Sequence, residues 1–497
     1  MGCDALKRKL CIIFFLVLLI LCGCKNEAAL SADTLIDKDL NGVDLDRINK
    51  YKIELTLNEI EKSFKGRQWT TYVNNSGENL DEIYFHIYPN AFKSLETAPI
   101  LFKEYPDPLS YKGGYIDILK VLVDEKEIEY SIQGVDETIL NIKLEKPLQN
   151  YKKTTIYLEY EVKLPNAKDR FGYGDRVINC GNAYPIVCVY DENGWNLEPY
   201  YKLGDPFYSD IANYNVSITT DKDMVIAGSG NILSVKTDGD KKIYNIEAKL
   251  MRDFAWAGSF NFKVMEKLVD ETVLRLYYLD DNSAMISFSL DAGENSLKIF
   301  NKKFGKYPYG QYSIVMTEFP SGMEYPGIVF ISNDYFKNYV RSLLEQVIVH
   351  ETAHQWWYGL VGSNAVNEAW LDEGLTTYSE VIYFREKDGN TAGNYYYIDN
   401  IKNGYDYGKN YLSEDEVVNK PLKDFSGWND YGILVYTKGA MFVNAIKEKY
   451  GEDALYEILS TYFDRYKYYN ATTEDFIKVC EEVTKEDFSN LVSKWLY

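Results

Sequence analysis

Apolar and polar residues alternate along the first half of the chain with the two-residue period of a half-buried strand. The alternation is regular at residues 156–163 and again at residues 214–219, and Asp, Asn and Gly residues separate such runs. This arrangement is typical of antiparallel sheets that pack one face on a core and expose the other to solvent. We therefore expect antiparallel strands from about residue 50 to residue 262.

From about residue 285 onward the apolar residues follow the spacing of helices. A turn-prone stretch at residues 362–364 separates two such segments, so the second is expected to be a new helix that runs back across the first. Thr472 and Asp475 form a capping-box pattern that predicts the start of another helix. The first segment has neither Gly nor Pro before Gly359, and these apolar positions predict its helix: Leu343, Leu344, Val347, Ile348, Trp356, Trp357 and Leu360.

The first of these helices contains the string His350-Glu351-Thr352-Ala353-His354, with two of the three histidines in 497 residues. Residues four apart lie on one helix face, where two imidazoles can reach a single zinc ion. Glu351 is turned partly toward the same side, where it can reach water at the metal. The alternative is a core helix whose histidines only satisfy local hydrogen bonds. The pattern favours a zinc hydrolase.

A hydrolytic zinc site typically has three protein ligands and one position for water. Glu373 lies early in the second helix, and its position relative to His354 makes it the candidate third ligand. Glu380 is seven residues further on and shares its helix face, so it is a candidate for orienting one imidazole. Plain exposure to solvent is the alternative for Glu380. The expected cofactor is one Zn²⁺ per chain.

The arrangement of these residues resembles the aminopeptidase N family of zinc metallopeptidases. In that family the paired histidines are followed, after eighteen intervening residues, by a glutamate in a Trp-Leu-Asp-Glu-Gly context, as Glu373 is here. Residues 252–256, 304–309 and 494–496 also resemble the family. The resemblance implies an α+β fold, with an antiparallel, saddle-like β domain at residues 46–262. A thermolysin-like, mostly helical catalytic domain is expected at residues 263–497.

The resemblance also implies roles outside the metal site. Gly322, Met323 and Glu324 match a substrate-binding stretch of the family, in which the glutamate binds the free α-amino group of a peptide. Tyr436, in a Tyr-Thr-Lys-Gly context, corresponds to the tyrosine that donates its phenolic proton to the tetrahedral oxyanion. Tyr431 is a nearby competitor for that role.

Two features depart from the family pattern. Tyr325 stands where the family has asparagine, which puts the backbone contacts to substrate in doubt but leaves the Glu324 carboxylate in place. The Gln-x-Glu anchor of the N-terminal domain is not recognisable, and residues 182–185 stand in its place. The second contact to the substrate amine is therefore unassigned.

These features predict an aminopeptidase. Zinc would acidify water and polarise the scissile carbonyl, and Glu351 would act as general base and then as general acid. The alternatives are a surface zinc metalloendopeptidase, an epoxide hydrolase of one branch of the family, and a non-catalytic lipoprotein that binds peptides or carbohydrate. Glu324 argues against the first two, because only a substrate with a free amine needs it, and Glu351 argues against the third.

The amino terminus has the features of an export signal. Lys7-Arg8-Lys9 precede an apolar run from Leu10 to Leu21, which is shorter than a typical span and predicts a signal peptide over residues 1–23. Residues 21–24 resemble a bacterial lipobox, which implies a lipid on Cys24, and an uncleaved membrane anchor is the alternative. Residues 24–45 are expected to form a flexible tether. We therefore expect an exported protein, lipid-anchored to the outer face of a bacterial membrane.

The net charge limits the class of partner that is expected, and the cysteine content limits the expected use of disulfides. The net charge of −21 suits an exported domain and argues against nucleic acid as a partner, which leaves peptides with a free amino terminus. Besides Cys24, the odd set Cys180, Cys188 and Cys480 argues against a disulfide-stapled architecture. Cys180 and Cys188 can form either a bridge or a pair of thiols.

Overall fold

The alternating pattern of the N-terminal half forms strands with one buried face, as predicted. In β8 (Lys153–Lys163) every second residue from Thr154 to Val162 is buried, and β14 (Ala212–Asp221) alternates in the same way. The computed structural model describes residues 34–100, 109–337, 340–412 and 415–497. The predicted signal peptide and Cys24 lie outside the described residues.

The largest sheet of this half has eight strands, in the order β16-β17-β14-β1-β2-β8-β4-β5. The pairing is antiparallel apart from β1 and β14, which run parallel. The other strands of this sheet are β1 (Asn49–Asn58), β2 (Ser63–Val73), β4 (Tyr115–Val123), β5 (Lys126–Glu127), β16 (Asn231–Asp238) and β17 (Lys241–Met251).

Two four-stranded sheets and one hairpin complete the half. They have the orders β15-β18-β10-β9, β11-β3-β7-β6 and β12-β13. Their strands are β3 (Leu80–His86), β6 (Tyr130–Gln133), β7 (Ile139–Leu148), β9 (Phe171–Tyr173), β10 (Ile178–Cys180), β11 (Ile186–Val187), β12 (Tyr190–Asp191), β13 (Gly194–Trp195), β15 (Val225–Gly228) and β18 (Trp256–Ser259). A short 3₁₀-helix, η1 (Tyr88–Lys93), follows β3.

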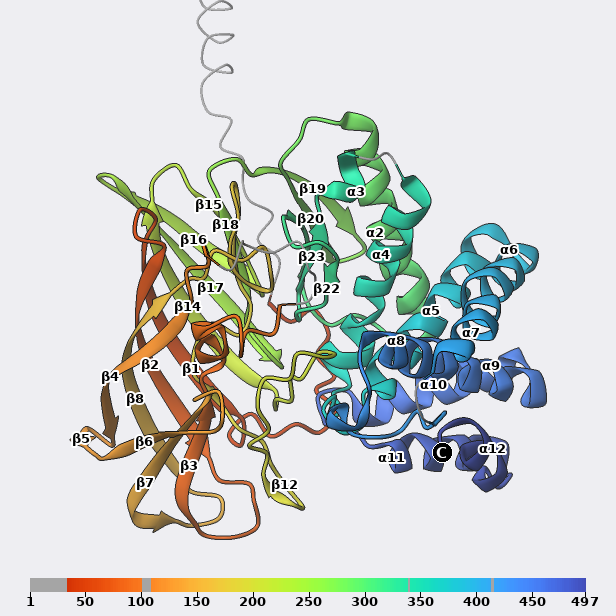
Figure 1. Cartoon of the computed structure of the whole chain (residues 1–497), viewed down its shortest axis with the longest axis horizontal. Helices are drawn as coiled ribbons and strands as arrows, with labels where there is room; N and C mark the ends of the chain where they lie inside the picture. The colour runs from red at the N-terminus through yellow and green to blue at the C-terminus, as the bar shows by residue number, and fades with distance from the viewer. Residues whose placement is uncertain (1–33, 101–108, 338–339, 413–414) are drawn as a thin grey trace, which may run out of the picture. The chain divides into compact units, whose positions relative to one another are not determined.

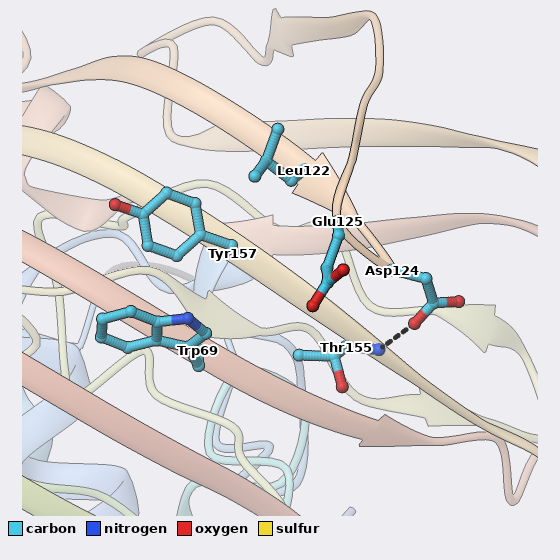
Figure 2. A pocket seen from close by; sticks show the side chains of 6 residues that line it. All are labelled: Trp69, Leu122, Asp124, Glu125, Thr155 and Tyr157. Carbon is cyan, nitrogen blue, oxygen red and sulfur yellow. Dashed lines mark hydrogen bonds between the residues drawn. The ribbon is translucent and has the colours of Figure 1, made fainter.

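The solvent face of the eight-stranded sheet carries an aromatic pair, shown in Figure 2. Trp69 and Tyr157 are cross-strand partners whose ring centroids lie 5.1 Å apart. The Lys52 ammonium lies 4.5 Å from the Trp69 ring centroid, and Leu122 pairs with Tyr157 on the other side. Such cross-strand contacts stabilise neighbouring strands on a solvated face. A shallow pocket of about 520 Å³ lies over this pair.

The C-terminal half begins with a sheet, which corrects the expectation of helices from residue 285 onward. Three of its five strands lie after that residue: β21 (Gln311–Thr317), β22 (Gly322–Met323) and β23 (Ile328–Ser332). They pair with β19 (Lys263–Val269) and β20 (Thr272–Tyr278) in the order β19-β20-β21-β23-β22. All residues of β21 and β23 are buried, so these strands lack the alternation of a half-buried strand.

Helices make up the rest of this half (Figure 1). The capping box predicted at Thr472 and Asp475 is confirmed, with reciprocal side-chain to backbone hydrogen bonds. The α-helices are α2 (Ser283–Lys303), α3 (Asp334–Lys337), α4 (Arg341–Ala353), α5 (Trp370–Asp388), α6 (Asn390–Tyr396), α7 (Asn403–Gly408), α8 (Trp428–Tyr431), α9 (Gly439–Tyr450), α10 (Glu452–Tyr466), α11 (Thr473–Thr484) and α12 (Ser489–Trp495). Between them lie π-helical segments η2 (Gln355–Leu360), η3 (Tyr397–Lys402) and η6 (Gly432–Lys438), and 3₁₀ turns η4 (Lys409–Tyr411) and η5 (Leu422–Asp424).

The α+β class expected from the sequence is confirmed, with a strand-rich half followed by a mostly helical half. The part of the chain that the structure describes packs as a single unit, so the boundary between residues 262 and 263 stays a prediction. Within the described ranges, no helix combines the length and hydropathy that crossing a bilayer requires.

Cys180, Cys188 and Cys480 are free and buried, so Cys180 and Cys188 form a pair of thiols and not a disulfide bridge.

The predicted tether at residues 24–45 is wrong for the part that the structure describes. Leu35 forms a β-bridge with Tyr309, and the Ile36 amide donates to the Pro308 carbonyl at 2.8 Å. Asp37 pairs with Lys467 at 3.0 Å, and the Asn41 side chain donates to the carbonyl oxygens of residues 465 and 467. This segment therefore packs on the helical half by specific bonds.

Candidate active site

Two helices bring the three predicted metal ligands together. His350 lies in the last turn of α4, and His354 follows directly at its C-terminal cap. Glu373 lies in the first turn of α5, the helix expected after the turn at residues 362–364. The two imidazole Nε2 atoms are 3.2 Å apart, and Glu373 Oε2 is 3.2 Å from one and 3.3 Å from the other.

This geometry fits a zinc ion. Ligand atoms held at about 2.0–2.1 Å from one ion in a tetrahedron lie about 3.3–3.4 Å from each other. The three observed separations are within about 0.2 Å of that value. Two imidazole nitrogens and one carboxylate oxygen are also the donor set of hydrolytic zinc sites, which leaves one position for water.

The other nitrogen of each imidazole is bonded to a carboxylate. His350 Nδ1 lies 2.6 Å from Glu380 Oε1, and His354 Nδ1 lies 2.5 Å from Asp372 Oδ1. Such bonds fix the tautomer in which Nδ1 carries the proton and Nε2 is free for a metal. Glu380 is therefore buried at His350, where the sequence suggested it. Asp372 was missed, although its position directly before Glu373 was a usable signal.

The electrostatics of the cluster favour a cation. Burial alone would lower the pKa of His350, but hydrogen bonds to Glu373 and Glu380 outweigh it and raise the pKa to about 10. Burial of His354 is likewise outweighed by the charges of Asp372 and Glu373, so its pKa is raised. Both imidazoles therefore lie in a strongly negative potential, which also attracts a metal ion.

Glu351 lies beside the three ligands with a free carboxylate oxygen. It is 6% exposed, and its Oε2 has no hydrogen-bond partner among the described residues. A Cβ atom built on Gly322 would lie 1.9 Å from Glu351 Oε1, so only glycine lets β22 approach this carboxylate. Burial raises the pKa of Glu351 to about 7, against the opposing charges of His350 and His354.

A second group of carboxylates adjoins the metal ligands. Glu324 follows β22, and its carboxylate lies within 4.8 Å of both Glu373 and Asp205, counting one oxygen from each. Asp205 comes from the N-terminal half and pairs with the buried Arg170, whose Nε contacts the Met323 sulfur at 3.1 Å. Burial, followed by the charge of Asp205, raises the pKa of Glu324 well above its usual value. Asp205 was missed because it lies in a loop without a motif.

Residues 182–185 stand where the family has its Gln-x-Glu anchor, and two of their side chains contact Asp253. Asn182 and Tyr184 both hydrogen-bond to the buried carboxylate of Asp253, the latter at 2.7 Å. Gly181 faces Tyr325, since a Cβ built there would lie 1.8 Å from the tyrosine hydroxyl oxygen. The departure at Tyr325 is thus accommodated by a glycine from the N-terminal half.

Tyr436 reaches the metal ligands from the π-helical segment η6. Its hydroxyl donates to Glu373 Oε1 at 2.5 Å, and its ring stacks on the His350 ring with centroids 5.9 Å apart. Gly439, the glycine of the Tyr-Thr-Lys-Gly sequence, is needed for close packing next to Tyr436. A Cβ built on Gly374 would lie 3.1 Å from the Gly439 Cα, so the two glycines let the backbones meet beside Glu373. Tyr431 packs against Tyr436 edge to face, with its hydroxyl near Gly204.

Comparisons with known proteins agree with this site. Residues 288–495 match the model of the Peptidase family M1 domain. Aminopeptidase 2 of Candida albicans is 23% identical over 81% of this chain and 45% of its own length. Aminopeptidase N of Lactobacillus helveticus is 22% identical over 80% of this chain and 48% of its own length. The chain thus spans about half the length of these curated relatives.

Solved structures extend the likeness in fold to most of the chain. The crystal structure of an M1 zinc metallopeptidase from Deinococcus radiodurans aligns with a TM-score of 0.65 and 16% identity, covering 90% of this chain and 93% of that one. The family domain, the relatives and this fold coincide with the paired histidines and Glu373. Residues 288–495 therefore match an M1 peptidase domain, and this match supports the resemblance of the chain to the aminopeptidase N family of zinc metallopeptidases.

Proposed function

We propose that this protein is a zinc-dependent aminopeptidase that removes residues from the free amino terminus of peptides. The observation that carries the proposal is the buried Glu324 carboxylate within 4.8 Å of Glu373. A carboxylate at that distance can bind the ammonium group of a peptide whose first peptide bond lies at the metal ligands. The names of the relatives, aminopeptidase 2 and aminopeptidase N, support the same activity.

Each side chain has a distinct part in this reaction. Zinc, when bound by His350, His354 and Glu373, supplies Lewis-acid polarisation of the carbonyl and acidification of water. Glu351 accepts a proton from the attacking water on its free carboxylate oxygen and passes it to the leaving amine. Burial favours this transfer, because it keeps the pKa of the carboxyl near neutrality.

Tyr436 stabilises the negative charge that develops on the carbonyl oxygen. Its hydroxyl rests on Glu373 Oε1, and rotation about the bond between ring carbon and oxygen redirects the proton toward a bound substrate. Glu324 and Asp205 together hold the substrate ammonium. Because they bind the charged terminus itself, they limit cleavage to the first residue of the peptide.

The reaction is tested with amino-acid anilides. We expect hydrolysis that a chelator abolishes, that zinc restores, and that acetylation of the substrate amine prevents. Replacing Glu351→Gln should lower kcat by about 10²–10⁴-fold while one zinc per chain is retained. Glu448→Gln, on an exposed glutamate, is the matched control. Equal cleavage of acetylated and free substrates would overturn the assignment as an aminopeptidase.

We further propose that the enzyme is exported and held on the outer face of a bacterial membrane by a lipid on Cys24. The lipobox-like residues 21–24 support this location. Mass spectrometry of the membrane-extracted protein should find an acylated Cys24 as the first residue. Cys24→Ser should release the protein from the membrane fraction, and a variant that remains bound would contradict lipid attachment.

A further inference from the structure

Carboxylates outnumber the cations that can balance them around the metal ligands. Among the Lys and Arg side chains that the structure describes, only Arg170 pairs with a carboxylate of this cluster. One zinc ion and one guanidinium carry three positive charges, whereas the cluster has six carboxyl groups, so the remaining groups need either protons or a further cation. These carboxylates are each more than nine-tenths buried: Asp205, Glu324, Glu351, Asp372, Glu373 and Glu380.

Glu324 is the carboxylate of this cluster at which a further cation is most needed. Its side chain is 4% exposed, and its Oε1 has no hydrogen-bond partner among the described residues. One oxygen each from Glu324, Asp205 and Glu373 lie within 4.8 Å of one another. Three buried carboxylates at this spacing repel one another unless a cation lies among them or one of them takes up a proton.

We propose that Asp205, Glu324 and Glu373 bind a second divalent cation when no peptide is bound. Carboxylate oxygens are preferred by Mg²⁺, Ca²⁺ and Mn²⁺, whereas imidazole nitrogens suit zinc. Glu373 belongs to both sets. Its Oε2 faces the two imidazoles, and its Oε1 lies on the side of Tyr436.

Arg170 holds the Asp205 side of this site in place. Its Nη2 donates both to Asp205 and, at 3.1 Å, to the Gly204 carbonyl, while its Nε contacts the Met323 sulfur. The guanidinium is 2% exposed and therefore has little freedom to move. Asp205 thus keeps a fixed carboxylate, which favours binding of an ion over rearrangement of the loop.

The second cation and the substrate ammonium require the same carboxylates, so they exclude each other. This consequence rests on the proposed aminopeptidase function, whereas binding of the ion does not. A hard divalent ion in excess should therefore inhibit competitively, raising KM for an anilide and leaving kcat unchanged.

The test uses zinc-loaded full-length enzyme titrated with Mn²⁺, with free Mn²⁺ measured by electron paramagnetic resonance and zinc by mass spectrometry. We expect one Mn²⁺ per chain beside one retained zinc. Asp205→Asn should weaken Mn²⁺ binding at least tenfold without loss of zinc. Asp210→Asn removes an exposed carboxylate five residues away and should leave Mn²⁺ binding unchanged. Leucine amide should raise the apparent Kd for Mn²⁺, and N-acetyl-leucine amide should not.

The outcomes separate this inference from the proposed function. Anilide hydrolysis without Mn²⁺ binding would refute the second site and leave the aminopeptidase intact. Binding that survives Asp205→Asn, or that displaces zinc, would also refute it. Mn²⁺ binding that depends on Asp205 in an enzyme without anilide hydrolysis would support the ion site and refute its competition with a substrate amine.

Discussion

At the scale of single residues, each imidazole of the candidate zinc site is held by its own buried carboxylate. Glu380 bonds to His350 and is itself bonded by Tyr396 and, at 3.3 Å, by Gln346. Asp372 bonds to His354 in a position that is 2% exposed. These bonds set the ring orientation before a metal arrives, which lowers the cost of binding it.

Removing one of these carboxylates should weaken zinc binding without unfolding the protein. We expect Asp372→Asn to reduce zinc affinity by about 10–100-fold, because the amide orients His354 less firmly. Competition with a chelator of known affinity measures the change. Asp388→Asn, at the exposed end of the same helix, is the control. Unchanged affinity in Asp372→Asn would mean that packing alone orients the ring.

Asp253 provides a pH-dependent contribution to stability away from the metal. Burial raises its pKa to about 7, against hydrogen bonds from Tyr184, the Phe254 amide and Asn182. Because the folded pKa is above the unfolded value, the folded state binds the additional proton. The contribution is complete below about pH 4 and is lost as pH rises through about 7.

Asp253→Asn should remove this dependence. Between pH 5 and pH 8 the free energy of unfolding of the natural protein should fall more steeply than that of the variant, as urea titrations at each pH would show. The Asn182 amide can rotate to accept from the new amide, since its oxygen has no partner among the described residues. Parallel curves for both proteins would exclude Asp253 as the source.

The sequence indicated the candidate ligands but not all of their partners. His350, His354 and Glu373 were recognisable because their spacing is a property of two neighbouring helices. Asp205 was not, because its loop reaches the site only through the tertiary fold and has no periodic pattern of its own.

At the scale of elements, the contact between Gly374 and Gly439 positions Tyr436. The backbones of α5 and the start of α9 are in contact there. Because η6 directly precedes α9, this contact places Tyr436 next to Glu373. π-helical segments such as η6 often occur at functional sites. The side-chain pattern of residues 432–438 gave no indication of this geometry.

Gly439→Ala should separate the two helices and misplace Tyr436. We expect kcat to fall about tenfold or more with little change in KM, together with a loss of about 1–3 kcal/mol of stability. Gly432→Ala adds the same methyl group within η6 where no atom lies within 4 Å, so it should be neutral. Steady-state kinetics and urea unfolding of both variants measure the difference. Equal effects of both substitutions would argue against the contact.

Strand and helix prediction succeeded where one face of an element meets water. β8 and β14 alternate visibly, and the capping box at the start of α11 is local in sequence. β21 and β23 were missed because they are buried on both faces, so their apolar runs carry no period that separates strand from helix.

At the scale of the whole molecule, Arg252 joins the strand-rich half to the helical half. Its guanidinium is 1% exposed and donates to the carbonyls of Tyr358 at 2.8 Å and Tyr469 at 3.1 Å, and also to Ser209 and Asn470. The sequence singled out residues 252–256 only by their resemblance to the family. The sequence could not indicate these partners, because Tyr358, Tyr469 and Asn470 are more than one hundred residues away along the chain and Ser209 is 43 residues away.

Arg252→Met should destabilise the protein by about 3–5 kcal/mol, because several buried carbonyls would lose their donor. Urea unfolding monitored by tryptophan fluorescence measures the loss. Arg67→Met, which removes an ion pair with Glu54 on the exposed sheet face, should cost less than about 1 kcal/mol. Similar losses for both variants would show that Arg252 does not join the two halves.

The segment at residues 34–41 has a practical consequence for work with shortened versions of the protein. Lys467 is 4% exposed and pairs with Asp37, so a version that begins after Asn41 would leave a buried ammonium without this carboxylate. Removing one partner of a fully buried ion pair typically costs about 3–5 kcal/mol, and the loss of the partly exposed Asp37 should cost less than that. Recombinant forms designed to omit the predicted signal peptide for crystallisation should therefore start no later than Thr34.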